Sequence, residues 1–320
     1  MILITGGSGF IGSNLIRYLN SQGRNDILIL DNFKNGEKFL NINNLNFFDL
    51  YDKDYFYNES LDKKIINKIT KIVHLGACSS TQEWNGEYLL KTNYENSKYL
   101  LHLALENNID FIYASSASVY GDGSGGFGAD KLDTKPLNAY AFSKLIFDRY
   151  VHNYLSENPC EQNVVGLRFF NVYGPGEAHK GAMTSPVYNF FHQIQETGTC
   201  KVFEEIRNGY RVDHLRDFVH VDDCSQIITH FINNNVPQRL INVGTGSPSS
   251  FQKVAEHVMA ALGKPASEIS YVHFPEALLG RYQSYTCADL SSLRSSGYDG
   301  SFIDLGLGID SYVRVLKNGY

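Results

Sequence analysis

The 320-residue sequence predicts an α/β protein built on a doubly wound parallel sheet of the Rossmann type, with a smaller, mostly C-terminal α/β domain. Two observations predict this fold. Short apolar runs alternate with helical patterns through the first half of the chain, as in sheets whose parallel strands are joined by helices. A glycine-rich segment also separates the first apolar run from the first helical pattern.

The expected strands are short, apolar and flanked by turn residues, which is typical of parallel strands buried on both faces. They cover residues 2–5, 27–30, 72–75, 111–114, 164–170 and 239–243, with helical patterns at 11–19 and 96–105. After residue 172 the pattern loosens into loops and shorter elements. We therefore expect one domain from residues 1–172 and 211–245, and a second from 173–210 and 246–320.

The composition excludes several classes of function. Apolar residues make up 43% of the chain, enough for a sizeable core, and the net charge of −6 indicates neither a nucleic-acid partner nor an anionic membrane. The five cysteines form no C-x-x-C pair and no metal-ligand spacing, which favours a reducing compartment and predicts no metal site. No apolar run approaches the ~20 residues of a membrane helix. We expect a cytoplasmic protein without a targeting peptide.

A dinucleotide-binding loop is expected directly after the first strand. Residues 6–12 read Gly-Gly-Ser-Gly-Phe-Ile-Gly and contain the G-x-G-x-x-G pattern in its required position, between a strand and a helix. In this pattern the first glycines allow a tight turn, Gly9 lets the main chain approach a pyrophosphate, and Gly12 lets the helix pack on the strand. The helix N-terminus then supplies N–H groups and a favourable dipole to the phosphates.

The acid at the end of the second strand leaves the choice of cofactor open. Asp31 lies nineteen residues after Gly12, where an acid ordinarily binds the ribose hydroxyls of NAD and repels a 2′-phosphate. Asn32, Lys34 and Lys38 follow it, and a lysine there could neutralise the 2′-phosphate of NADP. The spacing alone therefore does not decide between the two dinucleotides.

A tyrosine and a lysine four residues apart form a candidate acid–base pair. On a helix Tyr140 and Lys144 lie on one face, and the cation is expected to lower the pKa of the phenol so that it can exchange a proton with an alcohol. Ser116 closes the fourth expected strand, at the edge of the sheet where ligands bind, and could hydrogen-bond the reacting oxygen.

Several motifs together resemble the extended short-chain dehydrogenase/reductase superfamily, whose members act largely on nucleotide sugars. They are residues 5–12, 115–121, the Tyr140/Lys144 pair, 168–175 and 216–223. The narrower stretches 76–81, 83–84, 177–181 and 280–283 are similar to those of the ADP-L-glycero-D-manno-heptose 6-epimerases, enzymes of lipopolysaccharide core precursor synthesis. The resemblance runs from residue 1 to about residue 316.

The resemblance implies an NADP-dependent isomerase, a homo-oligomer, with ADP-heptose as substrate and the second domain as its binding domain. It implies that Tyr140 and Lys180 are alternative acid–bases, that Lys144 supports Tyr140 and contacts the nicotinamide ribose, and that Ser116 binds the reacting oxygen. The implied cofactor contacts are Gly6, Gly9, Phe10, Ile11, Gly12, Asp31, Asn32, Lys38, Lys53, Leu75, Gly76, Ala77, Cys78, Ser79, Asn93, Lys144, Val172 and Lys180. The implied substrate contacts are Asn171, Ala182, Asn189, Phe203, Glu204, Glu205, Ile206, Arg216 and Tyr282.

The sequence also departs from this family at a few positions. Leu75 stands where a glutamate is common, Gly176 replaces an arginine or a similar residue, Ala182 a serine and Asn189 a histidine. The segment 205–215 is longer than expected. These departures concern contacts with the nucleotide and the sugar.

The chemistry of inversion predicts two acid–bases. A secondary alcohol without an acidic neighbouring proton can be inverted by oxidation to a ketone, rotation of that ketone, and return of hydride to its other face. The oxygen then occupies two positions, and each needs its own acid–base. Lys180, in a loop that follows a strand, is the candidate for the second acid–base. The main alternative is a UDP-hexose 4-epimerase with NAD, which works with the tyrosine alone. A dehydratase is disfavoured because no acid follows Ser116, and a non-catalytic binding protein because Tyr140 and Lys144 are both present.

Overall fold

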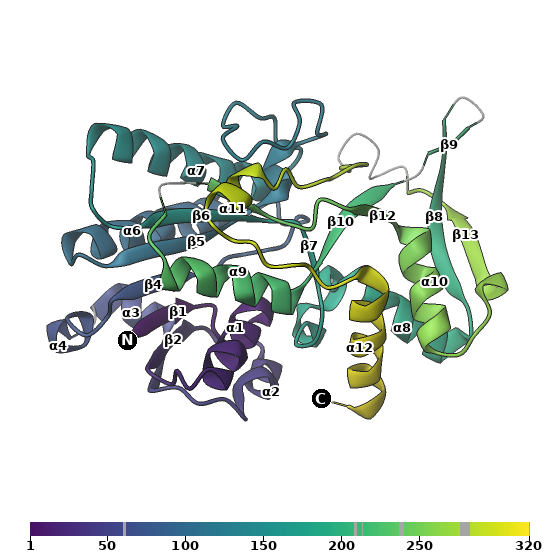
Figure 1. Ribbon diagram of the computed structural model, residues 1–320, viewed down its shortest axis with the longest axis horizontal. Coiled ribbons are helices and arrows are strands. Elements are labelled where there is room, and N and C mark those ends of the chain that lie inside the picture. The colour runs from purple at the N-terminus through teal and green to yellow at the C-terminus, as the bar shows by residue number, and fades with distance from the viewer. Residues whose placement is uncertain (60–61, 208–209, 213, 237–239, 276–281, 320) are drawn as a thin grey trace.

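The computed structural model describes residues 1–59, 62–207, 210–212, 214–236, 240–275 and 282–319. Within these ranges a seven-stranded sheet lies at the centre, with helices on both faces (Figure 1). Its strand order is β11-β6-β5-β4-β1-β2-β3, and all its strand pairs are parallel. The strands are β1 (Ile2–Thr5), β2 (Ile27–Asp31), β3 (Asp49–Asp52), β4 (Lys71–His74), β5 (Asp110–Ser116), β6 (Val164–Phe169) and β11 (Leu240–Val243). The predicted fold class is confirmed.

The expected strands match the observed ones to within two residues. Leu75 and Phe170 lie just beyond β4 and β6, and residue 239, the expected start of the last strand, lies outside the described residues. The strand β3 was not predicted. Its ends are Asp49 and Asp52, both exposed, so it lacks the apolar run that marks the buried strands. As the edge strand of the sheet, it needs no such run.

Alternate side chains of each central strand pack against different helices, as the period of a strand requires. Ile2 and Ile4 share a core with Leu15 of α1, whereas Leu3 shares another with Leu100 of α6. The first face is covered by α1 (Phe10–Ser21), α9 (Val221–Asn233) and α11 (Ser291–Ser295), and the second by α3 (Lys53–Glu59), α4 (Lys63–Ile66), α6 (Asn96–Glu106) and α7 (Ala139–Glu157). No helix in the described ranges is both long and apolar enough to cross a membrane.

Two smaller sheets lie beside the central one in Figure 1. In the first, β10 (Leu215–His220) runs between β7 (Asn171–Tyr173) and β12 (Pro248–Ser250). In the second, β8 (Cys200–Arg207) runs between β13 (Ile269–His273) and β9 (Tyr210–Val212). A separate core joins these sheets to α8 (Pro186–Thr197), α10 (Phe251–Ala261) and α12 (Leu305–Asn318). The longer segment 205–215 thus contains the antiparallel pairing of β8 with β9.

The remaining elements are short. They are η1 (Gly36–Lys38), α2 (Phe39–Ile42), α5 (Gly86–Leu89), η2 (Leu90–Glu95), η3 (Ala117–Tyr120), η4 (Ala178–Met183) and η5 (Ala266–Glu268). Two of them, η1 and η4, carry Lys38 and Lys180 to the site described below.

A buried ion pair fixes α7 against the central sheet. The Asp148 carboxylate accepts hydrogen bonds from Arg168 Nε of β6 at 2.9 Å and from Ser115 Oγ of β5 at 2.9 Å. The side chains of Asp148 and Arg168 are both fully buried. Tyr140, Lys144 and Asp148 follow one another at intervals of four residues, so they lie on one face of α7. The pair therefore holds the helix that carries Tyr140 in register with the strand that ends at Ser116.

Replacement of Arg168 by methionine should destabilise the protein by about 3–5 kcal/mol, because it leaves the buried Asp148 carboxylate without its partner. The free energy of unfolding measured in urea checks this. A suitable control is Arg314→Met, which breaks the Arg314–Asp310 pair on the surface, where the arginine side chain is 73% exposed. Equal losses of stability in the two variants would contradict the role given to the buried pair.

Candidate active site

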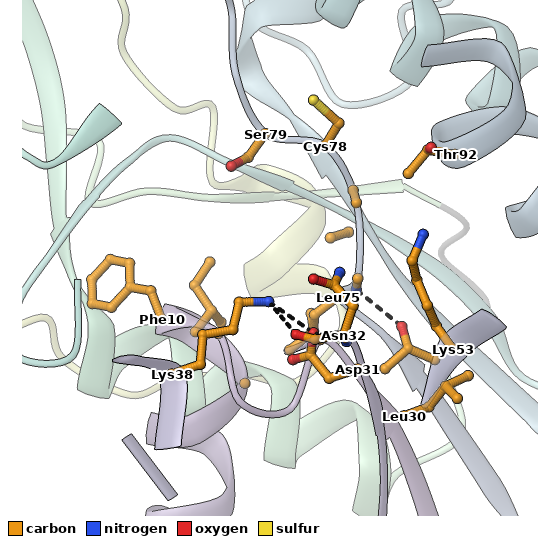
Figure 2. A pocket seen from close by; sticks show the side chains of 18 of the residues that line it. Phe10, Leu30, Asp31, Asn32, Lys38, Lys53, Leu75, Cys78, Ser79 and Thr92 are labelled. Carbon is orange, nitrogen blue, oxygen red and sulfur yellow. Dashed lines mark hydrogen bonds and ion pairs between the residues drawn. The ribbon is translucent and has the colours of Figure 1, made fainter. Parts of the chain in front are cut away.

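A cavity of about 430 Å³ opens at the carboxyl ends of β1, β2 and β4 (Figure 2). The strand order reverses here, since β2 lies on one side of β1 and β4 on the other. Open parallel sheets bind their ligands at such a switch point. Fifteen of the eighteen expected cofactor contacts line the cavity; the three that do not are Asn93, Lys144 and Val172.

The glycine loop that follows β1 approaches the main chain that follows β4 closely. Gly6 has a φ of +69°, and a Cβ on it would lie 2.8 Å from the Cα of Gly76. A Cβ on Gly12 would lie 2.2 Å from the carbonyl oxygen of Gly6. Only glycine fits these two positions. The α1 helix begins at Phe10, so its free N–H groups and the positive end of its dipole meet the cavity.

Lys38 engages the acid at the end of β2. Its Nζ donates to Asp31 Oδ1 at 2.9 Å and to the Asn32 carbonyl oxygen at 3.0 Å (Figure 2). The other carboxylate oxygen of Asp31 accepts hydrogen bonds from the main-chain N–H of Ser8 at 2.9 Å and from its hydroxyl. The charge of Asp31 is therefore balanced within the protein. Lys53 also lines the cavity, whereas Lys34 is exposed and does not.

Residues 75–79 form the part of the cavity wall that follows β4. Asn93 holds this wall from behind: its Oδ1 accepts from the Cys78 N–H at 2.8 Å, and its Nδ2 donates to the Cys78 carbonyl oxygen at 2.9 Å. Asn93 thus contacts the wall and not the cavity. Burial raises the pKa of the Cys78 thiol, which disfavours the nucleophilic thiolate.

A buried histidine ties the same wall to the glycine loop, and the sequence reasoning missed it. Thr5 Oγ1 accepts from the Gly76 N–H at 2.9 Å and lies 2.7 Å from His74 Nδ1. The Ser97 hydroxyl donates to the Asn93 carbonyl oxygen, so His74 Nε2, 2.9 Å away, must donate to Ser97 Oγ. Burial lowers the pKa of His74 to about 3, and the ring is neutral.

Tyr140 and Lys144 lie at the start of α7, which the Asn138 side chain caps by accepting from the Ala141 N–H at 2.8 Å. Lys144 Nζ donates to the carbonyl oxygen of Ala114, a cavity residue, at 2.8 Å, and Tyr140 hydrogen-bonds the Ser116 side chain. Tyr140 and Ser116 do not line the described cavity themselves.

The expected effect of Lys144 on Tyr140 is wrong. Burial raises the pKa of the Tyr140 phenol, and the hydrogen bond with Ser116 counteracts part of this rise. Burial also lowers the pKa of the Lys144 amine to about 8. The lysine is bound to main chain on β5, and loss of solvent dominates at the phenol.

Lys180 reaches the cavity from η4 and lies against Phe10, the first residue of α1. Its Nζ lies 5.0 Å from the centre of the Phe10 ring and 3.7 Å from Glu177 Oε2. Burial lowers the pKa of the Lys180 amine, and the Glu177 carboxylate opposes this change. The side chain is 22% exposed. The structure therefore brings Lys180 to the dinucleotide cavity.

None of the expected substrate contacts lines this cavity. Arg216 lies over the Tyr282 ring at 4.6 Å, and Phe274 joins that ring to Phe203, with ring centres 5.2 and 6.0 Å apart. Arg216 is buried, which lowers its pKa. The structure thus groups Phe203, Arg216 and Tyr282.

Glu204 and Glu205 adjoin this aromatic group, because the Glu204 carbonyl oxygen accepts from the Phe274 N–H and the His214 ring stacks on Phe274. Glu205 pairs with His214 at 3.0 Å, and Ile206 is exposed on β8 beside Glu204. Asn189 accepts a hydrogen bond from Thr184 at 3.0 Å, just after η4, which contains Ala182, and Asn171 begins β7. Among the departures from the family, Gly176 has a φ of +96°, where glycine is favoured.

Some cavity residues were not predicted. Thr5, Leu30 and Ala114 belong to the ends of predicted strands, and Ser80 and His179 adjoin predicted contacts, so their neighbours could have indicated them. No motif marks the others, which come from helices and from η2, η4 and the start of α6: Tyr57, Tyr88, Thr92, Asn96 and Met183.

Comparison with known proteins agrees with this geometry. The model of the NAD dependent epimerase/dehydratase family matches residues 2–244. An ADP-L-glycero-D-manno-heptose-6-epimerase of Brachyspira hyodysenteriae is 46% identical over 99% of this chain and 98% of its own length. One of Alkalilimnicola ehrlichii is 44% identical over 98% of this chain and 96% of its own.

The crystal structure of the Helicobacter pylori ADP-L-glycero-D-manno-heptose-6-epimerase superimposes with a TM-score of 0.80 at 29% identity, covering 98% of this chain and 94% of that one. The full-length match in sequence, the shared fold and the glycine-loop cavity lead to one conclusion: the chain belongs to the NAD dependent epimerase/dehydratase family and, within it, to the ADP-L-glycero-D-manno-heptose-6-epimerases.

Proposed function

We propose that this chain inverts C6 of ADP-glycero-manno-heptose, from the D-glycero to the L-glycero form, with tightly bound NADP, for synthesis of lipopolysaccharide core precursors. The observation that carries the proposal is the position of Lys180, a partly desolvated amine that lines the cavity of the glycine loop. A UDP-hexose 4-epimerase that works with a tyrosine alone has no use for this amine.

The residues of the cavity fit a dinucleotide. The N-terminus of α1 suits the pyrophosphate, residues 75–79 form a wall for the nicotinamide half, and Asn32, Lys38 and Lys53 surround the end of β2. When bound, NADP would take hydride from C6 and return it to the ketone, and its oxidised ring would bring a positive charge to the site. Because Lys38 already offsets Asp31, a 2′-phosphate would not face an uncompensated carboxylate.

Two proton carriers then serve the two positions of the sugar oxygen. Tyr140, hydrogen-bonded to Ser116, exchanges the proton of the C6 hydroxyl in one orientation. Lys180 does so in the other, since the burial that lowers its pKa makes the neutral amine easier to reach. Lys144 holds the carbonyl of Ala114, a residue that lines the cavity. Arg216, with its planar fork, is suited to the diphosphate of the substrate.

We also propose the division into a dinucleotide domain of residues 1–172 and 211–245 and a substrate domain of 173–210 and 246–320. The packing of α9 against α1, and the separate core around α8, α10 and α12, support it. A homo-oligomer in the cytoplasm is proposed from family membership alone.

The first prediction concerns the phenol. Tyr140→Phe should retain dinucleotide binding and lose epimerisation by ~10²-fold or more, the usual contribution of a general acid–base. Proton NMR of the sugar at the inverted carbon measures the rate. Tyr154→Phe, on the same helix but outside the site, is the control. Near-normal turnover of Tyr140→Phe would remove this residue from the mechanism.

The second prediction separates two proton carriers from one. Lys180→Met should slow epimerisation strongly and change dinucleotide affinity little, because one phenol cannot reach the oxygen in both orientations. With an aldehyde analogue of the sugar, the variant should retain redox chemistry in the orientation that Tyr140 serves, and the double variant with Tyr140→Phe should lose both. Epimerisation of Lys180→Met at the wild-type rate would favour the single-base 4-epimerase.

The third prediction tests the choice of cofactor. Lys38→Ala should weaken NADP binding more than NAD binding, since it removes a cation and leaves the Asp31 carboxylate uncompensated beside the 2′-phosphate. Dissociation constants of both dinucleotides would be measured by calorimetry, with Lys34→Ala as the control for a lysine outside the cavity. Equal losses for NADP and NAD would assign Lys38 to the loop structure alone.

A further inference from the structure

The segment that carries Lys180 is anchored by a single buried carboxylate, that of Glu177. This side chain is fully buried. It accepts hydrogen bonds from the Ser185 main-chain N–H at 2.5 Å and from the Ser185 hydroxyl at 2.5 Å. It also hydrogen-bonds the side chain of Tyr312. Ser185 caps the N-terminus of α8 and Tyr312 belongs to α12, so one carboxylate joins three parts of the chain.

The same carboxylate faces the Lys180 amine. Lys180 Nζ lies 3.7 Å from Glu177 Oε2, and the Lys180 main-chain N–H donates to the Glu177 carbonyl oxygen at 2.9 Å. In the part of the chain that the structure describes, Lys180 is the cation that lies within 4 Å of this carboxylate. Gly181, with a φ of +55°, turns the chain directly after the lysine. Amine and carboxylate are thus held together by a short turn.

The charged surroundings of Lys180 are few. Burial lowers the pKa of its amine, and Glu177 is the group that raises it. Beside it, His179 is half-buried; loss of solvent lowers the pKa of its ring, Lys38 and Lys180 lower it further, and Asp31 opposes them. The α1 side contributes the Phe10 ring, which carries no charge. Glu177 is therefore the carboxylate in position to decide how readily Lys180 holds a proton.

We propose that Glu177 is the positioning residue of Lys180: held in place by Ser185 and Tyr312, it aims the amine into the dinucleotide cavity and sets its charge. If Glu177 had a purely structural role at the start of α8, its hydrogen bonds to Ser185 would suffice, and its charge would not affect the protonation of Lys180. The role in catalysis rests on the proposed function of Lys180; the effect on its protonation does not.

The experiment measures the protonation of Lys180 directly. The full-length protein, with and without NADP, is exposed to a trace of an acylating reagent across a pH series, and mass spectrometry gives the extent of modification of Lys180, which only the neutral amine undergoes. In Glu177→Gln the midpoint, the pH at which half of Lys180 is modified, should fall by about one unit or more. This is the effect expected when an opposite charge close to an amine is lost. In the pH profile of epimerisation, the limb that reports deprotonation of Lys180 should move to lower pH.

Two control variants separate charge from structure. Ser185→Ala removes the α8 cap and keeps the carboxylate, so it should lower the melting temperature and leave the midpoint of Lys180 in place. Glu196→Gln, which neutralises an exposed carboxylate of α8, should change neither. If Glu177→Gln does not fold, Glu177→Asp serves instead: the carboxylate withdraws by one methylene, and the midpoint should move in the same direction by less.

An unchanged midpoint in a folded Glu177 variant, or an equal displacement in Ser185→Ala, would overturn the proposal. Failure of the proposed function looks different, because Lys180→Met would then epimerise at the wild-type rate whatever the midpoint of Lys180 is.

Discussion

The close approach of two main-chain segments, at Gly6 after β1 and Gly76 after β4, is the constraint on which the site depends. A Cβ on Gly6 would lie 2.8 Å from the Cα of Gly76, so side chains are excluded between them. Directly after this contact the chain turns from β1 into α1, and the start of that helix lines the cavity. The Asp31–Lys38 pair and the segment that carries Lys180 border the same cavity.

Around that cavity, several groups of the site are held by partners from other parts of the chain. Lys144 on α7 is bound to β5, the Cys78 main chain to Asn93 of η2, and Lys180 of η4 is paired with Glu177, whose other partners lie on α8 and α12. The Asp148–Arg168 pair orients α7 against β5 and β6. Groups on separate elements can keep a fixed geometry only if such cross-links hold them, and here every link is buried or partly buried.

The fold and the dinucleotide cavity could be predicted from the sequence because their signals are local. A buried parallel strand is an apolar run, and the glycine loop is one contiguous pattern. The edge strand β3 has no such run, and Tyr57, Tyr88 and Thr92 meet the cavity only through the packing of helices. The pKa of Tyr140 was predicted in the wrong direction, because spacing shows that Lys144 is near but not that burial outweighs it. The expected substrate contacts come from six separate segments, and no pattern predicts how those segments pack.

The buried imidazole of His74 makes the stability of the cavity wall depend on pH. Its single proton is on Nε2, and Nδ1 accepts from Thr5, whose oxygen in turn holds the Gly76 N–H. An unfolded histidine takes up a proton near pH ~6.5, whereas this one does so near pH 3, so the unfolded chain binds more protons between the two values. The contribution of His74 to stability is complete above that window and declines as the pH falls through it. A second proton on the ring would oppose the Thr5 hydroxyl with another donor, so acid would first disturb the junction of β1 and β4, on which the opening for the dinucleotide depends.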